Sequence, residues 1–558
     1  MKTIRPLVAL SLLTLLSAQS LEAELVASDI SPSDGERNVE LSTSIRLRLS
    51  EPAKVDTLPH LELYRIEEGT RVEKATTRYA TDLTNAAITI VPRDLLEPGA
   101  TYELVGSAKV ESTGGSRLTP FSSRFHTVSA AAPTESGLVF EPHTFDRNRS
   151  MTTVEFGPDG RLYAADAFGT LARWDIDEHG VPIKRAVLLS DPSESRQYID
   201  LAWDPAATAD SLVLWVSYGE RLDYAPSRKY YTGAIAKLTI GENVKQEVVV
   251  TGLPHGRERQ GGFDTLPHQP NGLLFKDGKL YQTVGSTSSS GGPANWGVPE
   301  QTLSGAAIQI DYKAIKETLD MHPDYGYDPS RPGAPLQLFA TGIRNALHLV
   351  GHSNGRIYTA VNLNDRRGPA DGVPDHPRIP GDQNLLVKQT TPDHESLLIV
   401  EEGRHYGFPN PARNQYVLMG GNPTAVNDPF EISDYPVGTA PDDGFAPELM
   451  YPIWQYGGTS PNGMIEYQPQ FPHPLRGALL CCFYSAGDIA AMPLGADGLP
   501  TSVKKLRGPK NKLPFNGPLD LTMDPRTGIL YVADFGTQNK FGSDGSMILL
   551  RPLDPDPQ

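Results

Sequence analysis

The chain has 558 residues, and at roughly 100–200 residues per domain it is long enough for two to four domains with their own cores. Lysine and arginine number 50 against 67 acidic residues, a formal net charge of -17, and no basic run offers a counter-charge for nucleic acid. The only two cysteines, Cys481 and Cys482, are adjacent, which excludes a disulfide framework, a haem-attachment motif and a cysteine-rich zinc site. The 52 glycines and 49 prolines require many turns and favour a β-rich architecture.

Residues 1–23 have the features of a secretory signal. Lys2 and Arg5 precede an apolar stretch from Leu7 to Leu16, and small residues follow. No cysteine follows that would accept a lipid, and no later segment approaches the ~18 apolar residues of a membrane span. A buried N-terminal helix is the alternative, but it leaves the positive flank and the short apolar core unexplained. We therefore expect an exported protein, periplasmic or extracellular, without a membrane span.

Residues 24–128 alternate apolar and polar positions, as half-buried β-strands do. At 45–49 three apolar residues alternate with two arginines, and Gly- or Pro-containing turns divide the region into about seven short strands. This pattern is typical of a β-sandwich. With ISPSDG at 30–35 and FHTV at 125–128, the region resembles a bacterial immunoglobulin-like (Ig-like) domain. Such modules serve mostly as spacers or docking surfaces, so the resemblance implies a protein or cell-surface partner.

Beyond a predicted linker at 129–137, one pattern recurs six times within residues 138–553. An apolar stretch, a turn and a second apolar stretch follow one another, which predicts a β-hairpin. The copies lie at 154–163, 201–216, 273–281, 349–358, 464–480 and 519–532. Because each copy has room for a further strand pair and long amphipathic helices are almost absent, we predict a six-bladed β-propeller rather than a parallel α/β fold. The apolar segments at 137–140 and 547–550 would share the terminal blade and close the ring. The predicted fold class is all-β, an Ig-like β-sandwich followed by a propeller.

Polar residues that precede the predicted inner strands are the first candidates for a site, because propellers bind ligands around the central channel. His268 precedes the third hairpin, and an imidazole titrating near neutrality could take a proton from a substrate hydroxyl. Arg344 and Asn345 precede the fourth hairpin, where a guanidinium could hold a carboxylate or polarise a carbonyl. From spacing alone, the leading interpretation is structural: His268 bonds a loop, and Arg344 pairs with an acid of the propeller.

Seven short motifs occur in the order seen in the glucose/sorbosone dehydrogenase family, whose members are soluble quinoprotein propellers. They are DLAWDP at 200–205, LPHQPNG at 266–272, LSG at 303–305, GIRN at 342–345, HYGFP at 405–409, SPNGM at 460–464 and RG at 476–477. The resemblance runs from about Thr152 to Pro552. The stretch at 362–365 and its insertion are more similar to the sorbosone-type branch than to the glucose-type branch.

The resemblance implies a sugar or aldose dehydrogenase that uses pyrroloquinoline quinone (PQQ) with Ca²⁺. His268 would remove the hydroxyl proton while hydride passes to the quinone, and Arg344 would polarise the quinone carbonyl. The implied cofactor contacts are Gln269, Asn345, Tyr406, Ser485 and Lys512. The backbone near Leu363 and Asn364 would supply carbonyl oxygens to Ca²⁺, a cation that prefers oxygen ligands.

Several positions depart from the family pattern. The cofactor carries three carboxylates, which need fixed cations. The family has an acid where this chain has Pro267, a lysine at the position of Ser485, and an arginine pair at the positions of Gly517 and Leu519. At about 1.5–3 kcal/mol for each charge-assisted hydrogen bond, three missing cations would weaken cofactor binding by several kcal/mol. Lys510, Lys512 and Lys540, on nearby loops, are the candidate substitute cations.

Two other functions stay open on the sequence. A non-catalytic propeller would recognise a glycan or a protein partner, with the Ig-like domain as its spacer. A metal-dependent lactonase or other hydrolase would need a carboxylate and amide cluster, for which Asn345, Asn462 and Asp534 are the candidates. The adjacent Cys481 and Cys482 either close a strained disulfide ring in an oxidising compartment or lie on opposite faces of a strand as inert core residues.

Overall fold

The computed structural model describes residues 24–39, 43, 45–67, 69–81, 86–92, 96–127, 137–190, 196–220, 231–255, 258–260, 263–265, 268–288, 291, 299–362, 395–424, 430–432, 435–453, 459–509, 512–537 and 543–553. These residues form β-strands and short 3₁₀ turns, without an α-helix among them, as the all-β prediction requires. In the same residues no helix has the length and hydropathy that crossing a membrane would take. The chain divides into two compact units near residue 127. The predicted signal at 1–23 and most of the predicted linker lie outside the described residues.

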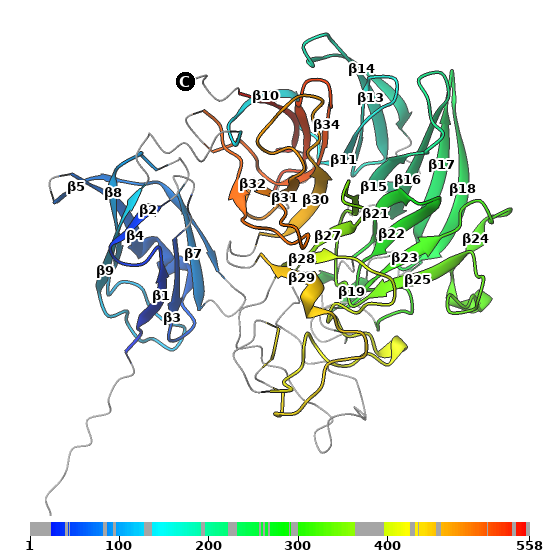
Figure 1. Ribbon diagram of the computed structural model, residues 1–558. Helices are drawn as coiled ribbons and strands as arrows, with labels where there is room; N and C mark the ends of the chain where they lie inside the picture. The colour runs from blue at the N-terminus through cyan, green and yellow to red at the C-terminus, as the bar shows by residue number, and fades with distance from the viewer. Residues whose placement is uncertain are drawn as a thin grey trace, which may run out of the picture. The chain divides into compact units, whose positions relative to one another are not determined.

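The first unit is a β-sandwich, drawn in blue in Figure 1. One sheet has the order β1-β3-β7-β6 and the other β2-β9-β8-β4-β5. The strands are β1 (Ala27–Ser31), β2 (Glu36–Val39), β3 (Ile45–Leu49), β4 (Leu61–Glu67), β5 (Thr70–Lys74), β6 (Thr77–Thr81), β7 (Ala87–Pro92), β8 (Thr101–Gly106) and β9 (Phe121–Thr127), with the 3₁₀ turn η1 (Val55–His60) before β4. In β3 the apolar side chains are buried and the two arginines are partly exposed, which confirms the predicted alternation.

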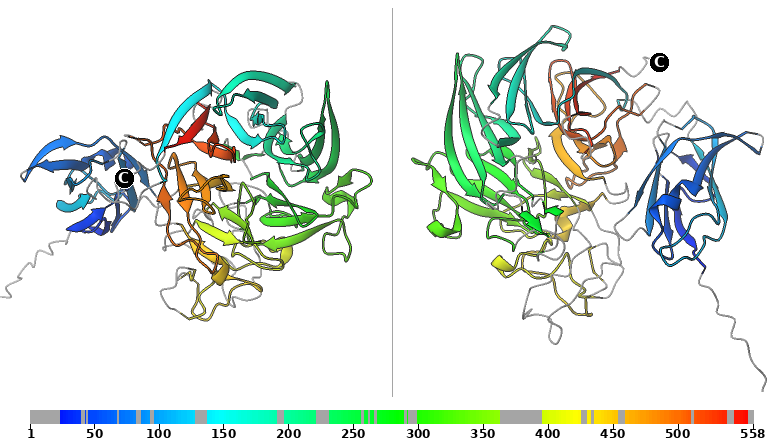
Figure 2. Two further views of the ribbon diagram at one scale, coloured as in Figure 1. Left: turned by 45° about the horizontal axis from the view of Figure 1, so that its top comes forward. Right: turned by 180° about the vertical axis from the view of Figure 1, so that it is seen from behind.

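The second unit is a ring of six sheets, shown from two further sides in Figure 2. Its inner strands contact one another in the cyclic order β11, β15, β21, β26, β30, β34 and back to β11. Blades 1 to 3 are β11 (Met151–Phe156), β12 (Leu162–Asp166), β13 (Thr170–Ile176), β14 (Pro182–Ser190); β15 (Arg196–Trp203), β16 (Leu212–Glu220), β17 (Gly233–Ile240), β18 (Val244–Leu253) with β24 (Leu319–Asp320); and β21 (Pro270–Lys276), β22 (Lys279–Val284), β23 (Ala306–Ile310), β25 (Leu336–Thr341).

Blades 4 to 6 are β26 (Val350–Gly351), β27 (Ile357–Val361), β28 (Ser396–Ile399), β29 (Met450–Pro452); β30 (Pro461–Glu466), β31 (Leu479–Phe483), β32 (Asp488–Met492), β33 (Lys504–Lys505); and β34 (Pro518–Met523), β35 (Leu530–Asp534), β36 (Ser546–Pro552) with β10 (Phe140–Arg147). Outside the blades lie the pair β19 (Glu258–Gln260) and β20 (Phe263–Thr265) and the 3₁₀ turns η4 (Pro323–Tyr325), η5 (Pro411–Arg413) and η6 (Pro447–Leu449). The six-bladed propeller is therefore confirmed in the described residues.

All six predicted hairpins are present as antiparallel pairs of an inner strand with the next strand of its blade. The turn between β21 and β22 shows why the sequence could specify them. Lys276 pairs with Lys279, and Asp277 and Gly278 between them have φ values of 49° and 75°. Two consecutive positive φ angles are those of a type I′ turn, for which Asp-Gly is a preferred sequence.

The ring closes between the two ends of the propeller. Strand β10 pairs antiparallel with β36, with Phe140 opposite Pro552 and Arg147 opposite Ser546. Phe140 is fully buried and meets the ring of Tyr467 edge-on at 6.3 Å between centroids. The two ends of the propeller share the terminal blade as predicted, but residues 547–550 pair with residues 142–146, and only Phe140 of the predicted segment 137–140 lies in β10.

Four ionisable side chains that we call the axial cluster, Glu155, Asp200, His348 and Asp520, lie on or beside the inner strands. His348 Nε2 is 3.7 Å from Asp200 Oδ2, and His348 Nδ1 is 3.8 Å from Asp520 Oδ1. Burial opposes the protonation of His348, but the carboxylates of Asp200, Asp520 and Glu155 outweigh it and raise its pKa to about 8. Burial, with the charge of Asp520, raises the pKa of Glu155 to about 8, and burial raises that of Asp200 to about 7.

The axial cluster also joins neighbouring blades through the backbone. Asp520 Oδ2 accepts a hydrogen bond from the backbone N–H of Val154 at 3.0 Å, and Asp200 Oδ2 accepts one from that of Leu273 at 2.6 Å. These bonds connect β34 to β11 and β15 to β21. A side chain lost from the cluster would therefore leave backbone groups in the interior without their partners.

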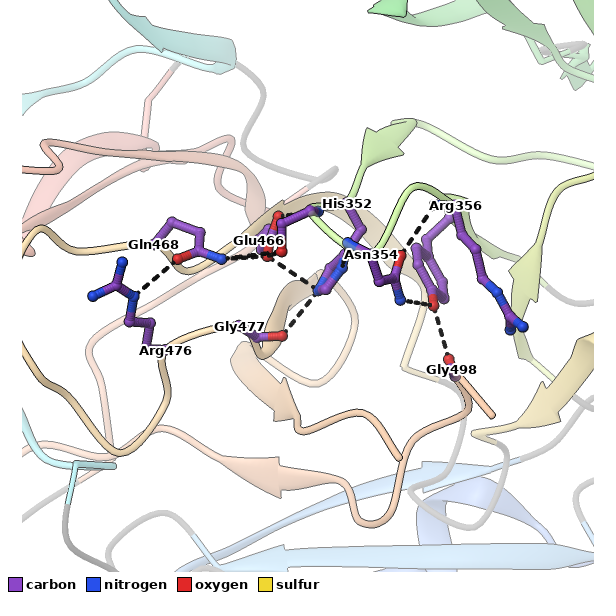
Figure 3. A network of polar contacts seen from close by, with 10 residues as sticks. His352, Asn354, Arg356, Glu466, Gln468, Arg476, Gly477 and Gly498 are labelled. Atoms are coloured by element: carbon purple, nitrogen blue, oxygen red, sulfur yellow. Dashed lines mark hydrogen bonds and ion pairs between the residues drawn. The ribbon is translucent and has the colours of Figure 1, made fainter. Parts of the chain in front are cut away.

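A second polar network, centred on His352 in the turn after β26, connects blades 4 and 5 (Figure 3). His352 Nδ1 accepts from the backbone N–H of Asn354 at 3.0 Å, so Nε2 carries the proton and donates to the carbonyl of Gly477 at 3.0 Å. Glu466 lies 3.2 Å from the same Nε2. Arg476 Nε donates to Gln468 Oε1 at 3.2 Å, so the arginine of the RG motif belongs to this network.

The two cysteines are free thiols on opposite faces of β31. Cys481 packs in a cluster with Met464 and Ile453, whereas Cys482 packs in another with Phe140. Both are fully buried, and burial raises the pKa of each thiol. The strand alternation therefore decides between the two sequence interpretations in favour of inert core residues.

Candidate functional site

The candidate site lies at one end of blade 3, where the inner strands begin. Three connecting segments meet there: the segment before β21 carries His268, the turn after β22 carries Gly285 and Ser286, and the segment after β25 carries Arg344 and Asn345. Alternating strand direction brings all three to the same end of the blade. His268 precedes the inner strand β21 and Arg344 precedes the inner strand β26, as their positions before the third and fourth predicted hairpins indicated.

Gly285 permits the close approach of these segments. A Cβ atom at Gly285 would lie 2.2 Å from the Cβ of His268 and 2.9 Å from Asn345 Oδ1. Its backbone N–H donates to the carbonyl of Gln269 at 2.9 Å. Because both distances are shorter than van der Waals contact, a larger residue would separate the histidine segment from the asparagine segment.

Ser286 bridges the two principal candidates. His268 donates its backbone N–H to the carbonyl of Ser286 at 3.1 Å, and Ser286 donates its own to the carbonyl of Arg344 at 2.7 Å. The side chains also meet, since His268 Nδ1 lies 2.9 Å from Ser286 Oγ. This bridge is what brings residues of two blade connections into one site.

The imidazole of His268 is neutral at physiological pH. Burial and then the positive charge of Arg344 hold its pKa well below the usual value. The sequence alone suggested a titration near neutrality, and the structure differs because burial, and then the neighbouring guanidinium, penalise a positive charge on the ring. A neutral imidazole can accept a proton, whereas an imidazolium cannot.

Arg344 is 8% exposed and lines a small cavity of about 20 Å³ together with Asn362 and the ring of Tyr406. A space of this size holds about one water molecule. The hydroxyl of Tyr406 donates to the carbonyl of Ile399 at 2.5 Å and accepts from the N–H of Glu401 at 3.0 Å. Because the backbone holds the hydroxyl of Tyr406, only its ring is left for the predicted contact with the cofactor.

Asn345 and Gln269, two further predicted cofactor contacts, take part in connections between blades. Asn345 Oδ1 accepts from Asn271 Nδ2 at 2.8 Å. Gln269 Oε1 accepts from Gln197 Nε2 at 3.2 Å and lies 2.9 Å from His255 Nε2. Since Gln197 and His255 belong to blade 2, the side chain of Gln269 points toward that blade.

The remaining predicted positions supply little positive charge. Ser485 is exposed in the turn after β31, and its N–H donates to the carbonyl of Thr459 at 3.0 Å. A Cβ atom at Gly517 would lie 2.5 Å from the ring of Tyr484, so this position has no room for a side chain. Lys512 is partly buried ahead of β34. The predicted calcium ligands Leu363 and Asn364 lie outside the described residues.

In the described part of the chain, no three His, Cys, Asp or Glu side chains are placed to hold an ion. Asp534 accepts backbone N–H bonds from Gly517 at 2.6 Å and Asn516 at 3.1 Å, one at each carboxylate oxygen. Burial raises the pKa of Asp534 to about 6. These two bonds indicate that the carboxylate of Asp534 holds a loop of blade 6 in place.

Comparison with known proteins gives a family for the first unit. Residues 22–127 match the bacterial Ig-like domain family. None of the curated proteins matches the chain in sequence.

Among solved structures, the chain is similar to several dehydrogenases. An oxidoreductase (glucose dehydrogenase) from Thermus thermophilus has 17% identity and a TM-score of 0.44, with 74% of this chain and 99% of that chain covered. The PQQ-bound aldose sugar dehydrogenase of Streptomyces coelicolor has 14% identity and a TM-score of 0.44, with 75% and 99% covered. The PQQ domain of the pyranose dehydrogenase of Coprinopsis cinerea has 12% identity and a TM-score of 0.46, with 74% and 97% covered.

Proposed function

We propose that the protein is an exported oxidoreductase that oxidises a hydroxyl or aldehyde group of a sugar, with PQQ as the hydride acceptor. The observation that carries the proposal is the neutral imidazole of His268 next to the guanidinium of Arg344, joined through Ser286 at the end of the inner strands. The order of the seven sequence motifs supports the same activity. When bound, PQQ supplies the two-electron acceptor that takes the hydride from the carbon being oxidised.

His268 has the properties of the base in this reaction. It accepts the proton of the substrate hydroxyl as the carbon loses its hydride, so the alcohol carbon is oxidised by two electrons. Burial and Arg344 lower the pKa of the resulting imidazolium, and the proton therefore leaves the site readily after each turnover. Arg344 is buried and permanently charged, which suits it to hold an anionic or developing oxyanionic group of the acceptor.

The described residues offer the three carboxylates of the cofactor less positive charge than they would need. Arg344 supplies one guanidinium, whereas Ser485 offers a hydroxyl and Gly517 offers no side chain. With Leu519 at the third position, three missing charge-assisted hydrogen bonds at about 1.5–3 kcal/mol each correspond to an affinity roughly 10³- to 10⁷-fold lower than that of a site with all three cations. Cofactor binding should therefore depend strongly on Arg344.

The test is reconstitution of the purified full chain with PQQ and Ca²⁺, followed by sugar-dependent reduction of an artificial acceptor dye. We expect His268→Gln to abolish dye reduction and retain cofactor binding, and Arg344→Gln to weaken cofactor binding. His143→Gln, an exposed histidine on β10, is the matched control and should behave as the wild type. Absence of PQQ binding at micromolar concentration in the wild type would contradict the proposal.

A second function, recognition of a glycan or protein without catalysis, is favoured by one observation. The ring of Tyr484 fills the space that a side chain at position 517 would need, so a cation there is excluded by packing. In the same titrations, partner binding that survives simultaneous replacement of His268 and Arg344, without dye reduction in the wild type, would support this function. Binding that requires both residues would count against it.

A further inference from the structure

A buried chain of hydrogen bonds leads from His268 into blade 3. His268 Nδ1 is 2.9 Å from Ser286 Oγ, and Ser286 Oγ donates to the carbonyl of Ser288 at 2.9 Å. Glu300 Oε1 accepts from the backbone N–H of Ser288 at 2.7 Å and from its hydroxyl at 2.5 Å. Ser286 and Ser288 are fully buried and Glu300 is 6% exposed. We call these three residues the Ser286 relay.

The relay determines which nitrogen of His268 carries the proton. A serine hydroxyl has one hydrogen to donate, and Ser286 gives it to the carbonyl of Ser288, which can only accept. The contact between Ser286 Oγ and His268 Nδ1 must therefore be donated by the imidazole. With the reverse assignment, the hydroxyl oxygen would face the carbonyl oxygen at 2.9 Å with no hydrogen between them.

Glu300 keeps the acceptor of the relay in place. Besides the two bonds from Ser288, it accepts from the backbone N–H of Thr287 at 3.1 Å and from the hydroxyl of Ser304. The hydroxyl of Ser288 is itself oriented, because it accepts from the N–H of Gly291 at 3.0 Å. The carbonyl of Ser288 thus has little freedom to turn away from Ser286.

We propose that Ser286 is a positioning residue that fixes the Nδ1–H tautomer of His268 and so makes Nε2 the atom that accepts a proton. The tautomer follows from the contacts of the relay alone, and only the use of Nε2 toward a sugar hydroxyl rests on the proposed function. The low pKa of His268 is consistent with a single proton on the ring. A serine also adds no negative charge that would stabilise an imidazolium.

His255 has the opposite tautomer and serves as an internal reference for His268. His255 Nδ1 accepts from the backbone N–H of Glu220 at 3.2 Å, and its Nε2 lies 2.9 Å from Gln269 Oε1. Nε2 therefore carries the proton in His255. Burial lowers the pKa of His255 to about 4, so this ring is neutral under the same conditions.

The experiment is NMR of the full chain with ¹⁵N-labelled histidine at pH 7, with the His268 signals assigned by their loss in His268→Gln. We expect a protonated-type shift at Nδ1 and an unprotonated-type shift at Nε2 for His268, and the reverse for His255. Ser286→Ala should lose the Nδ1–H preference, whereas Ser286→Thr, which keeps a hydroxyl, should retain it. Ser330→Ala, an exposed serine, should change neither ring.

The outcomes separate the positioning role from the proposed activity. A proton on Nε2 of His268 in the wild type, or an unchanged Nδ1–H signal in Ser286→Ala with the His255 signals intact, overturns the proposal. If Ser286→Ala does not fold, which the His255 signals report, the wild type and Ser286→Thr still decide the tautomer. Where sugar oxidation is measurable, Ser286→Ala should lower kcat in proportion to the lost tautomer and leave KM unchanged. The expected NMR result without dye reduction would refute only the activity.

Discussion

Replacing Glu155 with glutamine should flatten the pH dependence of the propeller's free energy of unfolding. The pKa values of Glu155 and His348 in the folded axial cluster are about 8 and that of Asp200 is about 7. All three are higher than the ordinary values of 4.5, 6.5 and 3.8. These three groups therefore bind more protons in the folded protein than in the unfolded chain between about pH 4 and pH 8, and their contribution to stability falls as the pH rises through this range.

The size of the effect follows from the proton counts. At pH 7, folded Glu155 holds about 0.9 of a proton that the unfolded chain has released, and the three groups together hold on the order of two extra protons. Each extra proton contributes about 1.4 kcal/mol per pH unit to the slope. The contribution of these three groups to stability should thus fall by roughly 3 kcal/mol from pH 6.5 to 7.5, and Glu155→Gln should remove roughly 1 kcal/mol of that fall. The contribution of His348, about 2 kcal/mol, is present below pH 6.5 and is lost as the pH rises through 8.

Urea unfolding followed by tryptophan fluorescence measures this quantity in the propeller alone, because all five tryptophans lie at residue 174 or later. The titration is repeated at pH 6, 7 and 8 for the wild type and for Glu155→Gln. Glu178→Gln is the control, since the Glu178 side chain is 87% exposed. A slope of stability against pH that Glu155→Gln leaves unchanged, or makes steeper in the falling direction, would refute the reasoning.

Three further changes test the site and the fold. Gly285→Ala puts a Cβ 2.2 Å from that of His268, so we expect the Nδ1–H signal of His268 and any dye reduction to be lost. If both are retained, the segments that carry Gly285 and His268 can separate without loss of the site. Phe140→Ala should lower the free energy of unfolding by about 3–5 kcal/mol, measured by urea titration, and a loss below about 1 kcal/mol would contradict a closed ring held by β10. Cys481 and Cys482 should react with a thiol reagent only after unfolding, and a reducing agent should not shift Tm; a shift would indicate a disulfide.

Much of the fold could be predicted because its signals are local. The Asp277-Gly278 pair specifies a tight turn by itself, and the apolar stretches on either side of it specify the strands. Six such hairpins in series leave few alternatives to a propeller. The ring closure could be predicted as well, since the sequence has an apolar segment near each end of the propeller region.

The site could be predicted only in part, because its contacts join residues that are not close in the sequence. His268 and Arg344 were identified by their position before an inner strand. Ser286 lies 18 residues after His268 and belongs to no motif. Its contact with His268 forms only when the turn after β22 folds back on the histidine. Gln269 and Tyr406 sit in matching motifs, yet the tertiary structure directs the amide to blade 2 and the hydroxyl to the backbone.

By itself, the sequence determined the all-β class, the number of hairpins and the end of the propeller at which the charged and titratable residues gather, because alternation and turn chemistry act over a few residues. Only the tertiary structure decided the protonation of those residues. The pKa of His268 depends on Arg344, the tautomer on Ser286 and Ser288, and the pKa values of the axial cluster on carboxylates from different blades. Electrostatic interactions and hydrogen bonds act through space, and the ring brings together residues that are far apart in the chain.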